Sequence, residues 1–460
     1  MLPEIYPAKI ELDVNGLPFA PDYDDRYFSR ESGLAETRHV FLQGNQLPTA
    51  WQHKEYFVIG ETGFGTGLNF LATWQAWSND PERCSTLHYI SVEKHPIPKQ
   101  LLAELLTQWP ELATLSAELL QKYPPVLSGF HQLSFANHRI HLTLCFAEAE
   151  SALQELVAEV DAWYLDGFTP TKNAAMWSPA LFRAIAEHSK PSTTLATFTV
   201  AGQVRRDLQA AGFACEKRLG FGQKREMLTA QLKQPAMKAN TAAWFSLPKL
   251  ESQTKTATVI GAGIAGCQIA YALAVRGWQV YLLERHAGIS REASGNRAGV
   301  LSPKMTAEPD WGEHFYRQAF LYAVRQLNQL AANPSLEWQA SGALQLNHNA
   351  SELKRWQALQ KRDLPQDFLQ LLEAGAASDL AGIELNLGGS YFPQGGYLYP
   401  KSLCAILVQH PNIHLQTQTE ALQLQQTPAG TWQVFKQNQQ LISINLRRNG
   451  AHLTTPPFQC

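Results

Sequence analysis

Apolar and polar positions alternate along the first half of the chain in a pattern that predicts an open parallel β-sheet. Short runs rich in β-branched and aromatic residues recur there, and stretches with helical periodicity, such as 100–106, lie between them. The β-rich runs cover residues 56–59, 88–92, 140–145, 162–165 and 194–198. Regular alternation of strands and helices is typical of an α/β fold whose parallel sheet carries helices on both faces.

A second α/β unit begins after a break in this pattern. Residues 230–254 lack regular periodicity and contain prolines, and a new apolar run follows at 257–260. At 460 residues the chain also exceeds what one hydrophobic core usually supports. We therefore predict a first domain at 1–235, a linker at 236–255 and a second domain at 256–460.

The composition excludes several classes of protein. Hydrophobic residues make up 45% and charged residues 17% of the chain, and no apolar run approaches the roughly 20 residues that span a bilayer. The N-terminus lacks the features of a secretory signal, and the cysteines are scattered without the CxxC pairs of a zinc site. The net charge of -2 does not by itself indicate nucleic-acid binding. We expect a cytoplasmic monomer with free thiols, no membrane span and no metal.

A glycine-rich turn follows the first apolar run. Glu61, Gly63, Gly65 and Gly67 form a Glu-x-Gly-x-Gly-x-Gly segment that leads into a helical stretch. Glycines let a backbone approach a ligand closely, and the start of a helix offers amides to the ligand's polar groups. A structural turn without a ligand is the alternative. The spacing resembles the first motif of class I methyltransferases, which use S-adenosylmethionine.

Two carboxylates at the ends of later strands favour a cofactor site. Glu93 ends the run 88–92, where a carboxylate can accept hydrogen bonds from both hydroxyls of a ribose. Glu148 follows the run 140–145, at a point where class I methyltransferases often have an acidic residue near the adenine amino group. We interpret both as contacts of S-adenosylmethionine.

Asp166 is the candidate catalytic residue. It directly follows the run 162–165, and ligands of open parallel sheets bind beyond the carboxyl ends of the strands. Methyl transfer to an amine requires a neutral, well-aligned nucleophile, and a carboxylate can orient the amine and receive its proton. A turn or helix-capping role is the alternative for Asp166. Phe168 and Trp177 could stack on a base, although core packing explains both equally well.

Around Asp166 the sequence closely resembles one enzyme family. The motif Asp-Gly-Phe-x-Pro-x-Lys-Asn-x-x-Met-Trp starts at Asp166, and further matching segments cover 24–28, 33–41, 196–199, 204–208 and 220–227. These segments resemble the bifunctional enzymes that modify the wobble uridine of tRNA. The resemblance implies methylation of 5-aminomethyl-2-thiouridine to 5-methylaminomethyl-2-thiouridine in the anticodon loop.

Several polar residues become candidate tRNA contacts through this resemblance. The candidates are Lys172, Arg205, Arg206, Lys224 and Arg225, together with Phe168 and Trp177. An ordinary solvated face is the alternative for the basic positions. Splayed bases of a single-stranded loop are accessible to such side chains.

The second half begins with a dinucleotide-binding pattern. Gly261, Gly263 and Gly266 form a GxGxxG turn after an apolar run, and Glu284 ends the next run, where it can hold a ribose. The segment 292–299, which contains Arg297, resembles the following loop of FAD enzymes of the D-amino-acid-oxidase type. We therefore expect FAD in a partial Rossmann domain with an α+β substrate subdomain.

In the resembling family this half is an oxidoreductase acting on CH-NH. It removes the carboxymethyl group of 5-carboxymethylaminomethyl-2-thiouridine, and the flavin supplies the redox chemistry. Residues 391–397 resemble a segment of the family's substrate subdomain, but a simple hairpin turn explains them equally well.

The C-terminal region departs from the family pattern. The chain after Glu284 is shorter than in such oxidases, and Arg447 and Arg448 occupy a position where the family has an apolar strand. We expect an FAD domain that is incomplete at its C-terminal side, with impaired oxidase activity.

Two other functions fit parts of the sequence. A small-molecule N-methyltransferase fused to an amino-acid oxidase would carry the same nucleotide sites. An RNA-binding protein with degenerate sites is a non-catalytic alternative, but the retained carboxylates in the first half argue against it.

Overall fold

The computed structural model describes residues 3–13, 17–28, 32–234, 255–428, 431–436 and 441–447. The chain divides into two compact units. The first comprises Met1–Lys238, Pro303–Arg325 and Leu346–Ser390, and the second comprises Ala239–Ser302, Gln326–Gln345 and Tyr391–Cys460. Almost all of the predicted linker at 236–255 lies outside the described residues.

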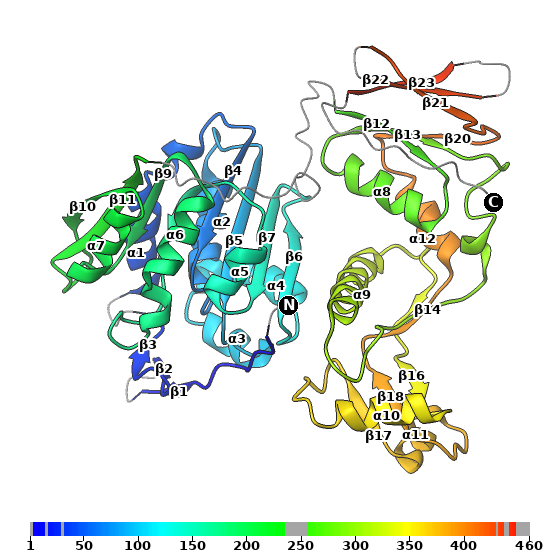
Figure 1. The fold of residues 1–460 in the computed structure, drawn as a ribbon, viewed down its shortest axis with the longest axis horizontal. Helices are drawn as coiled ribbons and strands as arrows, with labels where there is room; N and C mark the ends of the chain where they lie inside the picture. Colours follow the sequence, from blue (N-terminus) through cyan, green and yellow to red (C-terminus); the bar gives the residue numbers. More distant parts are fainter. Residues whose placement is uncertain are drawn as a thin grey trace. The chain divides into compact units, whose positions relative to one another are not determined.

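An eight-stranded sheet with the order β10-β11-β9-β8-β4-β5-β7-β6 forms the centre of the first unit (Figure 1). Strands β11 and β6 run antiparallel to their neighbours, and the other strands of this sheet are parallel to one another. The strands are β4 (Tyr56–Glu61), β5 (Thr86–Glu93), β6 (Gly129–Phe135), β7 (Ile140–Phe146), β8 (Val160–Tyr164), β9 (Ser189–Thr197), β10 (Phe213–Leu219) and β11 (Glu226–Leu232). A small antiparallel sheet precedes them, made of β1 (Glu11–Leu12), β2 (Pro18–Ala20) and β3 (Asp25–Arg26).

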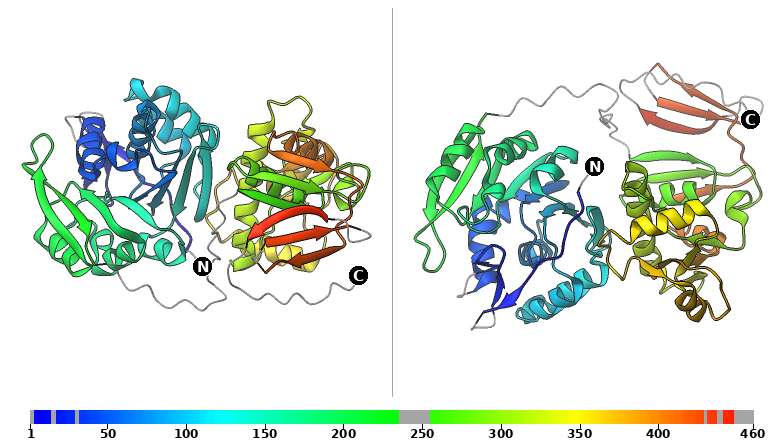
Figure 2. Two further views of the ribbon diagram at one scale, coloured as in Figure 1. Left: turned by 90° about the horizontal axis from the view of Figure 1, so that it is seen from above. Right: turned by 60° about the horizontal axis from the view of Figure 1, so that its bottom comes forward.

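Helices cover both faces of the large sheet (Figure 1, Figure 2). One face packs on α1 (Gly33–Thr37), α2 (Leu68–Asn79), α3 (Lys99–Leu106) and α4 (Ala113–Lys122), and the other on α5 (Ala149–Glu155), α6 (Pro179–Glu187) and α7 (Gly202–Ala210). Successive side chains of β4 point to opposite faces, so Phe57 and Ile59 join the first core and Val58 the second. Short 3-10 or π turns lie at η1 (Arg38–Leu42), η2 (Gln43–Asn45), η3 (Thr49–Trp51), η4 (Pro110–Leu112) and η5 (Ala174–Trp177).

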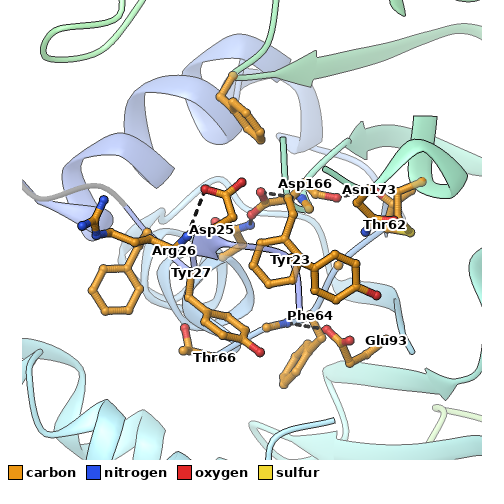
Figure 3. A pocket seen from close by; sticks show the side chains of 18 of the residues that line it. Tyr23, Asp25, Arg26, Tyr27, Thr62, Phe64, Thr66, Glu93, Asp166 and Asn173 are labelled. Atoms are coloured by element: carbon orange, nitrogen blue, oxygen red, sulfur yellow. Dashed lines mark hydrogen bonds between the residues drawn. The ribbon is translucent and has the colours of Figure 1, made fainter. Parts of the chain in front are cut away.

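The predicted β-rich runs of the first half are confirmed as β4, β5, β7, β8 and β9, and 100–106 falls within α3. The chain leaves β4 toward β5 and β7 on one side and later returns through β8 and β9 on the other. The order of the strands therefore reverses between β4 and β8. A crevice at such a reversal is the usual ligand site of an open α/β sheet, and a pocket lies there (Figure 3).

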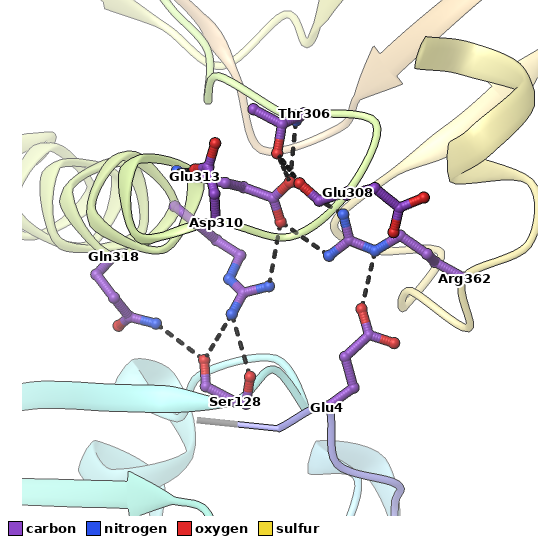
Figure 4. Close-up of polar contacts among 9 residues, drawn as sticks. Glu4, Ser128, Thr306, Glu308, Asp310, Glu313, Gln318 and Arg362 are labelled. Carbon is purple, nitrogen blue, oxygen red and sulfur yellow. Dashed lines mark hydrogen bonds and ion pairs between the residues drawn. The ribbon is translucent and has the colours of Figure 1, made fainter. Parts of the chain in front are cut away.

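A buried polar network ties distant segments together within the first unit (Figure 4). Glu313 is 2% exposed, and its carboxylate accepts hydrogen bonds from Arg362 Nη1 (2.9 Å) and Nη2 (2.8 Å) and from the Thr306 amide (2.9 Å). Arg362 Nε donates to Glu4 Oε1 (2.8 Å), and Arg317 Nη2 donates to the carbonyl oxygen of Ser128 (3.0 Å). The network thus joins the N-terminal segment and the start of β6 to α9 (Trp311–Leu330) and α10 (Ala350–Leu359).

A parallel sheet with the order β12-β13-β20 lies in the second unit. Its strands are β12 (Thr256–Ile260), β13 (Gln279–Leu283) and β20 (Ile413–Gln416), and α8 (Ile264–Ala274) connects the first two. The predicted run 257–260 is confirmed as part of β12. α8 packs with α12 (Pro400–Leu407) in a core that contains Cys267 and Cys404.

Smaller sheets complete the described part of the chain. Their orders are β14-β19-β15, β16-β18-β17 and β21-β22-β23. The strands are β14 (Gly299–Leu301), β15 (Trp338–Gln339), β16 (Ala343–Leu346), β17 (Gln370–Leu372), β18 (Gly389–Phe392), β19 (Gly396–Leu398), β21 (Gln423–Gln426), β22 (Thr431–Phe435) and β23 (Leu441–Arg447), with α11 (Ala374–Ala381) and the 3-10 turn η7 (Ala293–Gly295) between them. Arg447 ends β23, and Arg448 lies outside the described residues.

The hairpin interpretation of 391–397 is wrong. The Gly395 amide does close a tight turn on the Phe392 carbonyl oxygen (2.9 Å), but the strands on either side, β18 and β19, belong to different sheets. The turn therefore passes the chain from one sheet to another. Within the described residues, no helix combines the length and the apolar character needed to cross a bilayer.

Candidate active site

A cavity of about 370 Å³ opens at the carboxyl ends of β4, β5 and β8. The N-terminal segment that contains β3 supplies part of its wall. Seven of the residues singled out from the sequence line it, namely Gly63, Gly65, Glu93, Glu148, Asp166, Phe168 and Lys224. The structure thus brings together residues from five separate parts of the chain.

The glycine turn after β4 places the backbone against the cavity. Gly65 (φ +50°) and Gly67 (φ +74°) adopt left-handed conformations that side chains disfavour. A Cβ atom on Gly63 would lie 3.2 Å from the carbonyl oxygen of Asp166. Gly67 precedes the first residue of α2 and lies outside the lining.

Glu93 holds this turn in place from the end of β5. Its Oε2 accepts a hydrogen bond from the Gly65 amide (2.9 Å), and its Oε1 accepts one from the His95 amide (2.8 Å). Burial raises the pKa of Glu93, and these amide contacts oppose the shift. Each carboxylate oxygen has a second lone pair, so Glu93 can still accept hydrogen bonds from ribose hydroxyls in the cavity.

Asp166 lies at the floor of the cavity just after β8. Its Oδ1 accepts a hydrogen bond from the Gly167 amide (2.8 Å), and its Oδ2 accepts one from Asn69 Nδ2 (2.7 Å). Burial raises the pKa of Asp166 to about 6, against the effect of these two donors. A carboxylate with this pKa is largely ionised at neutral pH and can take up a proton from a bound group.

Glu61, the acidic residue of the glycine motif, lies beneath the cavity and is absent from its lining. It is fully buried, and its carboxylate accepts hydrogen bonds from Ser91 Oγ (2.6 Å) and Asn69 Nδ2 (2.8 Å). Burial raises the pKa of Glu61 to about 8. A direct contact between Glu61 and a cofactor stays a prediction.

Aromatic rings from two distant segments form one wall of the cavity (Figure 3). The ring of Tyr23 stacks on Phe168 with centroids 4.6 Å apart, and Tyr27 meets Phe168 edge-on at 5.3 Å. Asp25 Oδ2 accepts a hydrogen bond from the Thr169 amide (2.8 Å), which fastens this N-terminal segment to the loop after Asp166. Asp25 and Tyr27 belong to the segment 24–28 of the family resemblance, which carried no role for them, and Tyr23 lies just before that segment.

The other candidate substrate contacts lie outside the lining. Trp177 is buried and its Nε1 donates to the Phe168 carbonyl oxygen (2.8 Å), which favours the core-packing interpretation. Lys172 Nζ pairs with Asp24 Oδ2 (2.9 Å). Arg205, Arg206 and Arg225 do not line the cavity, and Arg206 donates to Gln203.

Lys224 stands at the rim of the cavity. Its Nζ pairs with Glu36 Oε1 at 2.8 Å and lies 4.4 Å from the centre of the Phe198 ring. Lys224 was a candidate substrate contact from the sequence, whereas Glu36 and Phe198, which line the same cavity, belong to the matching segments 33–41 and 196–199 without an assigned role. Further lining residues without an assigned role are Thr37, Asn69, Asn173 and Met176.

The second unit contains the predicted GxGxxG turn between β12 and α8. Gly261 has a left-handed conformation (φ +93°), and space is open where its Cβ would be. A Cβ on Gly266 would overlap the carbonyl oxygen of Gly261, so only glycine allows this close approach of helix and turn. Gly263 directly precedes α8.

Glu284 directly follows β13 and lies beside this turn. Its carboxylate accepts hydrogen bonds from the amides of Ala262 (2.8 Å) and His286 (2.8 Å). Arg297 is exposed. The glycine conformations and the carboxylate beside them fit the chemistry of a dinucleotide site. Among the described residues, no cluster of three or more His, Cys, Asp and Glu side chains could hold a metal ion.

Two family models match separate parts of the chain. Residues 110–233 match the family of S-adenosyl-L-methionine-dependent methyltransferases. Residues 256–445 match the family of FAD-dependent oxidoreductases. A crystal structure of MnmC2 from Aquifex aeolicus has a TM-score of 0.40 and 21% identity, covering 52% of this chain and 74% of that chain.

Curated relatives match nearly the whole chain. The protein named tRNA 5-methylaminomethyl-2-thiouridine biosynthesis bifunctional protein MnmC is 44% identical in Stutzerimonas stutzeri, over 93% of this chain and 65% of that protein. Its namesake in Pseudomonas fluorescens is 43% identical, over 96% of this chain and 68% of that protein. The chain thus spans about two thirds of the length of these relatives. It belongs to the family of bifunctional tRNA 5-methylaminomethyl-2-thiouridine biosynthesis proteins.

Proposed function

We propose that the first half of the chain transfers a methyl group from S-adenosylmethionine to the amine of 5-aminomethyl-2-thiouridine at the wobble position of tRNA. The observation that carries this proposal is the Asp166 carboxylate at the floor of a cavity beside the glycine turn. The names of the curated relatives supply the substrate class.

Asp166 would act on the substrate amine. An ammonium group cannot attack a methyl donor, so the amine must lose a proton before or during transfer. The ionised Asp166 would orient the amine by a hydrogen bond and accept that proton. The contact from Asn69 leaves Asp166 a further lone pair on each oxygen for this purpose.

The walls of the cavity would bind the two substrates. S-adenosylmethionine would supply the methyl group from its sulfonium. The backbone of Gly63 and Gly65, with Glu93 and Glu148, would bind its amino-acid and nucleoside parts. The rings of Tyr23, Tyr27 and Phe168 offer flat apolar surfaces on which a splayed wobble base could stack.

The second half would carry out the preceding step, oxidative removal of the carboxymethyl group from 5-carboxymethylaminomethyl-2-thiouridine. Gly261, Gly263, Gly266 and Glu284 would hold FAD, which would supply the electron acceptor, and we also assign Arg297 to this site. The flavin absorbance of the purified protein measures whether the site binds FAD.

Basic side chains of the first half, all exposed except the half-buried Arg205, would hold the tRNA backbone. Lys172, Arg205, Arg206, Lys224 and Arg225 are the candidates. Phosphates would compete with the present partners of Lys172 and Lys224, which are acidic side chains. Binding of tRNA should therefore weaken as the salt concentration rises.

The proposal is tested by labelled methyl transfer from S-adenosylmethionine to tRNA that carries 5-aminomethyl-2-thiouridine. Asp166→Asn keeps the shape but cannot accept a proton, and we expect its transfer rate to fall by roughly 100-fold or more. Asp379→Asn, an exposed carboxylate on α11, is the matched control and should retain full activity.

The same assay separates the proposal from the small-molecule alternative. Label in the wobble nucleoside after digestion of the tRNA supports the proposal. A folded wild type that binds S-adenosylmethionine but methylates free small amines, and not this tRNA, would show that the substrate is a small molecule. Equal activity of Asp166→Asn and wild type would show that Asp166 is not the base.

A further inference from the structure

The side chain of Asn69 connects the two buried carboxylates of the site. Its Nδ2 donates to Glu61 Oε1 (2.8 Å) and to Asp166 Oδ2 (2.7 Å). Its Oδ1 accepts a hydrogen bond from Thr37 Oγ1 (2.7 Å). Asn69 is 6% exposed and lies in the first turn of α2, directly after the glycine turn.

These contacts determine the orientation of the amide. Both hydrogens of Nδ2 are used, one for each carboxylate, and the hydroxyl of Thr37 supplies the donor that Oδ1 needs. A flipped amide would point its oxygen at Glu61 and Asp166 and would take its donor away from both of them. The backbone of Asn69 is held as well, because Thr73 Oγ1 donates to its carbonyl oxygen (2.7 Å).

Glu61 gives the amide a fixed anchor. Ser91 Oγ donates to its Oε2 (2.6 Å), and Glu61 is fully buried on β4, in the centre of the sheet. Asp166, by contrast, lies in the loop after β8, beyond Leu165, and lines the cavity. A rigid strand residue therefore holds a loop residue through one amide.

We propose that Asn69 is a positioning residue for methyl transfer, because its amide ties the carboxylate of Asp166 to the buried Glu61 and so fixes the direction in which Asp166 meets the substrate amine. This inference rests on the proposed function of the site. It assigns Asn69 the role of holding Asp166. It also assigns Glu61 the role of anchoring Asn69, which requires no contact between Glu61 and the methyl donor.

The hydrogen bond from Asn69 Nδ2 to Asp166 Oδ2 also favours the ionised form of Asp166. An amide donor stabilises a carboxylate more than a carboxylic acid, so its loss would raise the pKa of Asp166. The charged and titratable groups that influence Asp166 or are influenced by it are Glu61 on β4, Tyr89 and Glu93 on β5, Glu36 on α1, and Lys224 between β10 and β11. Of these, Lys224 favours the ionised form of Asp166 and Glu36 opposes it.

Asn69→Leu tests the inference, because leucine has a similar size and no donor. We expect kcat to fall by roughly 10-fold or more, with little change in the KM for S-adenosylmethionine. The acid side of the pH profile should move up by about one pH unit, since one hydrogen bond to a charged group is lost. The acid side is compared on the same tRNA substrate, so titration of the substrate amine is common to both proteins.

Thr73→Val is the matched control. It removes a buried hydroxyl from the same helix and a hydrogen bond to the same residue, but it leaves both carboxylate contacts intact. Its pH profile should match that of the wild type. If Asn69→Leu fails to fold, Thr37→Val provides the second test, because it frees the amide to rotate and should move the profile in the same direction by less.

A readout without turnover separates this inference from the proposed function. In protein with ¹³C-labelled aspartate carboxyls, the Asp166 signal is assigned by its loss in Asp166→Asn, and its titration midpoint is compared between wild type and Asn69→Leu. A higher midpoint in the variant supports the role of Asn69 in holding Asp166. This result would stand even if the wild type methylated no tRNA, because absence of methylation would contradict only the proposed function. An unchanged midpoint with unchanged kcat would overturn the inference.

Discussion

At the scale of single residues, the carboxyl groups of the site differ more clearly in whether they line the cavity than in the direction of their pKa shifts. Burial raises the pKa of Glu61, Glu93 and Asp166 alike. Of these three, only Glu93 and Asp166 line the cavity, and both oxygens of each already accept one hydrogen bond. Asp166 therefore combines access with a pKa near neutrality, which is what proton transfer from an amine requires.

Methyl transfer should weaken in acid because of this residue. Asp166 accepts a proton only when ionised, and the ionised fraction falls as the pH drops through about 6. We expect kcat to decline below pH 6 and the decline to be absent from the residual activity of Asp166→Asn. The measurement is the initial rate of labelled methyl transfer at saturating substrates between pH 5 and 8. An acid side of the same midpoint in the variant would assign the titration to another group.

At the scale of elements, strands buried on both faces were predictable and strands at the edges were not. β4, β5 and β8 are mostly buried and rich in apolar residues because helices cover them on both sides. β10 is mostly exposed, and β6 alternates in burial, so neither resembles those runs. The pairing of β18 and β19 with different sheets also depends on distant partners.

The candidate site divides in the same way. Glu93, Glu148 and Asp166 were predictable because each lies at or just beyond the end of a parallel strand, and the carboxyl ends of parallel strands meet at one edge. Tyr23 and Asn69 were not, since one comes from the N-terminal segment and the other depends on hydrogen bonds between three elements.

The turn between β12 and α8 should not tolerate a side chain at Gly266. Gly266→Ala would force its Cβ into the carbonyl oxygen of Gly261, so the helix or the turn must shift. We expect a clear loss of thermal stability of the second unit and loss of flavin absorbance. Gly375→Ala, in the first unit, is the control for the replacement itself and should leave the second unit unchanged, because Gly375 is an exposed helical glycine with open space at its Cβ, where alanine usually stabilises by roughly 0.5–1 kcal/mol. Equal melting of the two variants would contradict this account.

At the scale of the whole molecule, the ion pair between Glu313 and Arg362 is part of a network that joins distant segments of the first unit. Burial alone would raise the pKa of Glu313, but the hydrogen bonds from Arg362 and Thr306 outweigh it and lower the pKa. The stabilisation is therefore present above pH 4.5 and is lost as the pH falls through the lowered pKa. Arg362 also reaches Glu4 (2.8 Å), near the start of the chain.

Arg362→Met should destabilise the first unit strongly. It would leave Glu313 buried without its two closest donors, and breaking one side of a buried pair usually costs about 3–5 kcal/mol. Glu313→Leu combined with Arg362→Met removes both charges and should recover part of the loss, because the buried Arg317, 3.7 Å from Glu313 Oε1, loses this partner in the double variant. Chemical denaturation of the wild type, both single variants and the double variant measures the coupling. A single-variant effect below about 1 kcal/mol would mean that water replaces the pair.

The outer strand of the large sheet carries a last consequence. β10 forms the end of the sheet opposite β6, and its Lys217 and Arg218 pair with Glu226 and Glu216 on the molecular surface. An unpaired strand edge invites the backbone of another chain to add to it, which is a common beginning of aggregation. A strand that docked here would have to approach this row of opposite charges and disturb their pairing and hydration. The charged side chains of β10, which do not line the cavity, should therefore disfavour aggregation by the addition of a further strand to this edge.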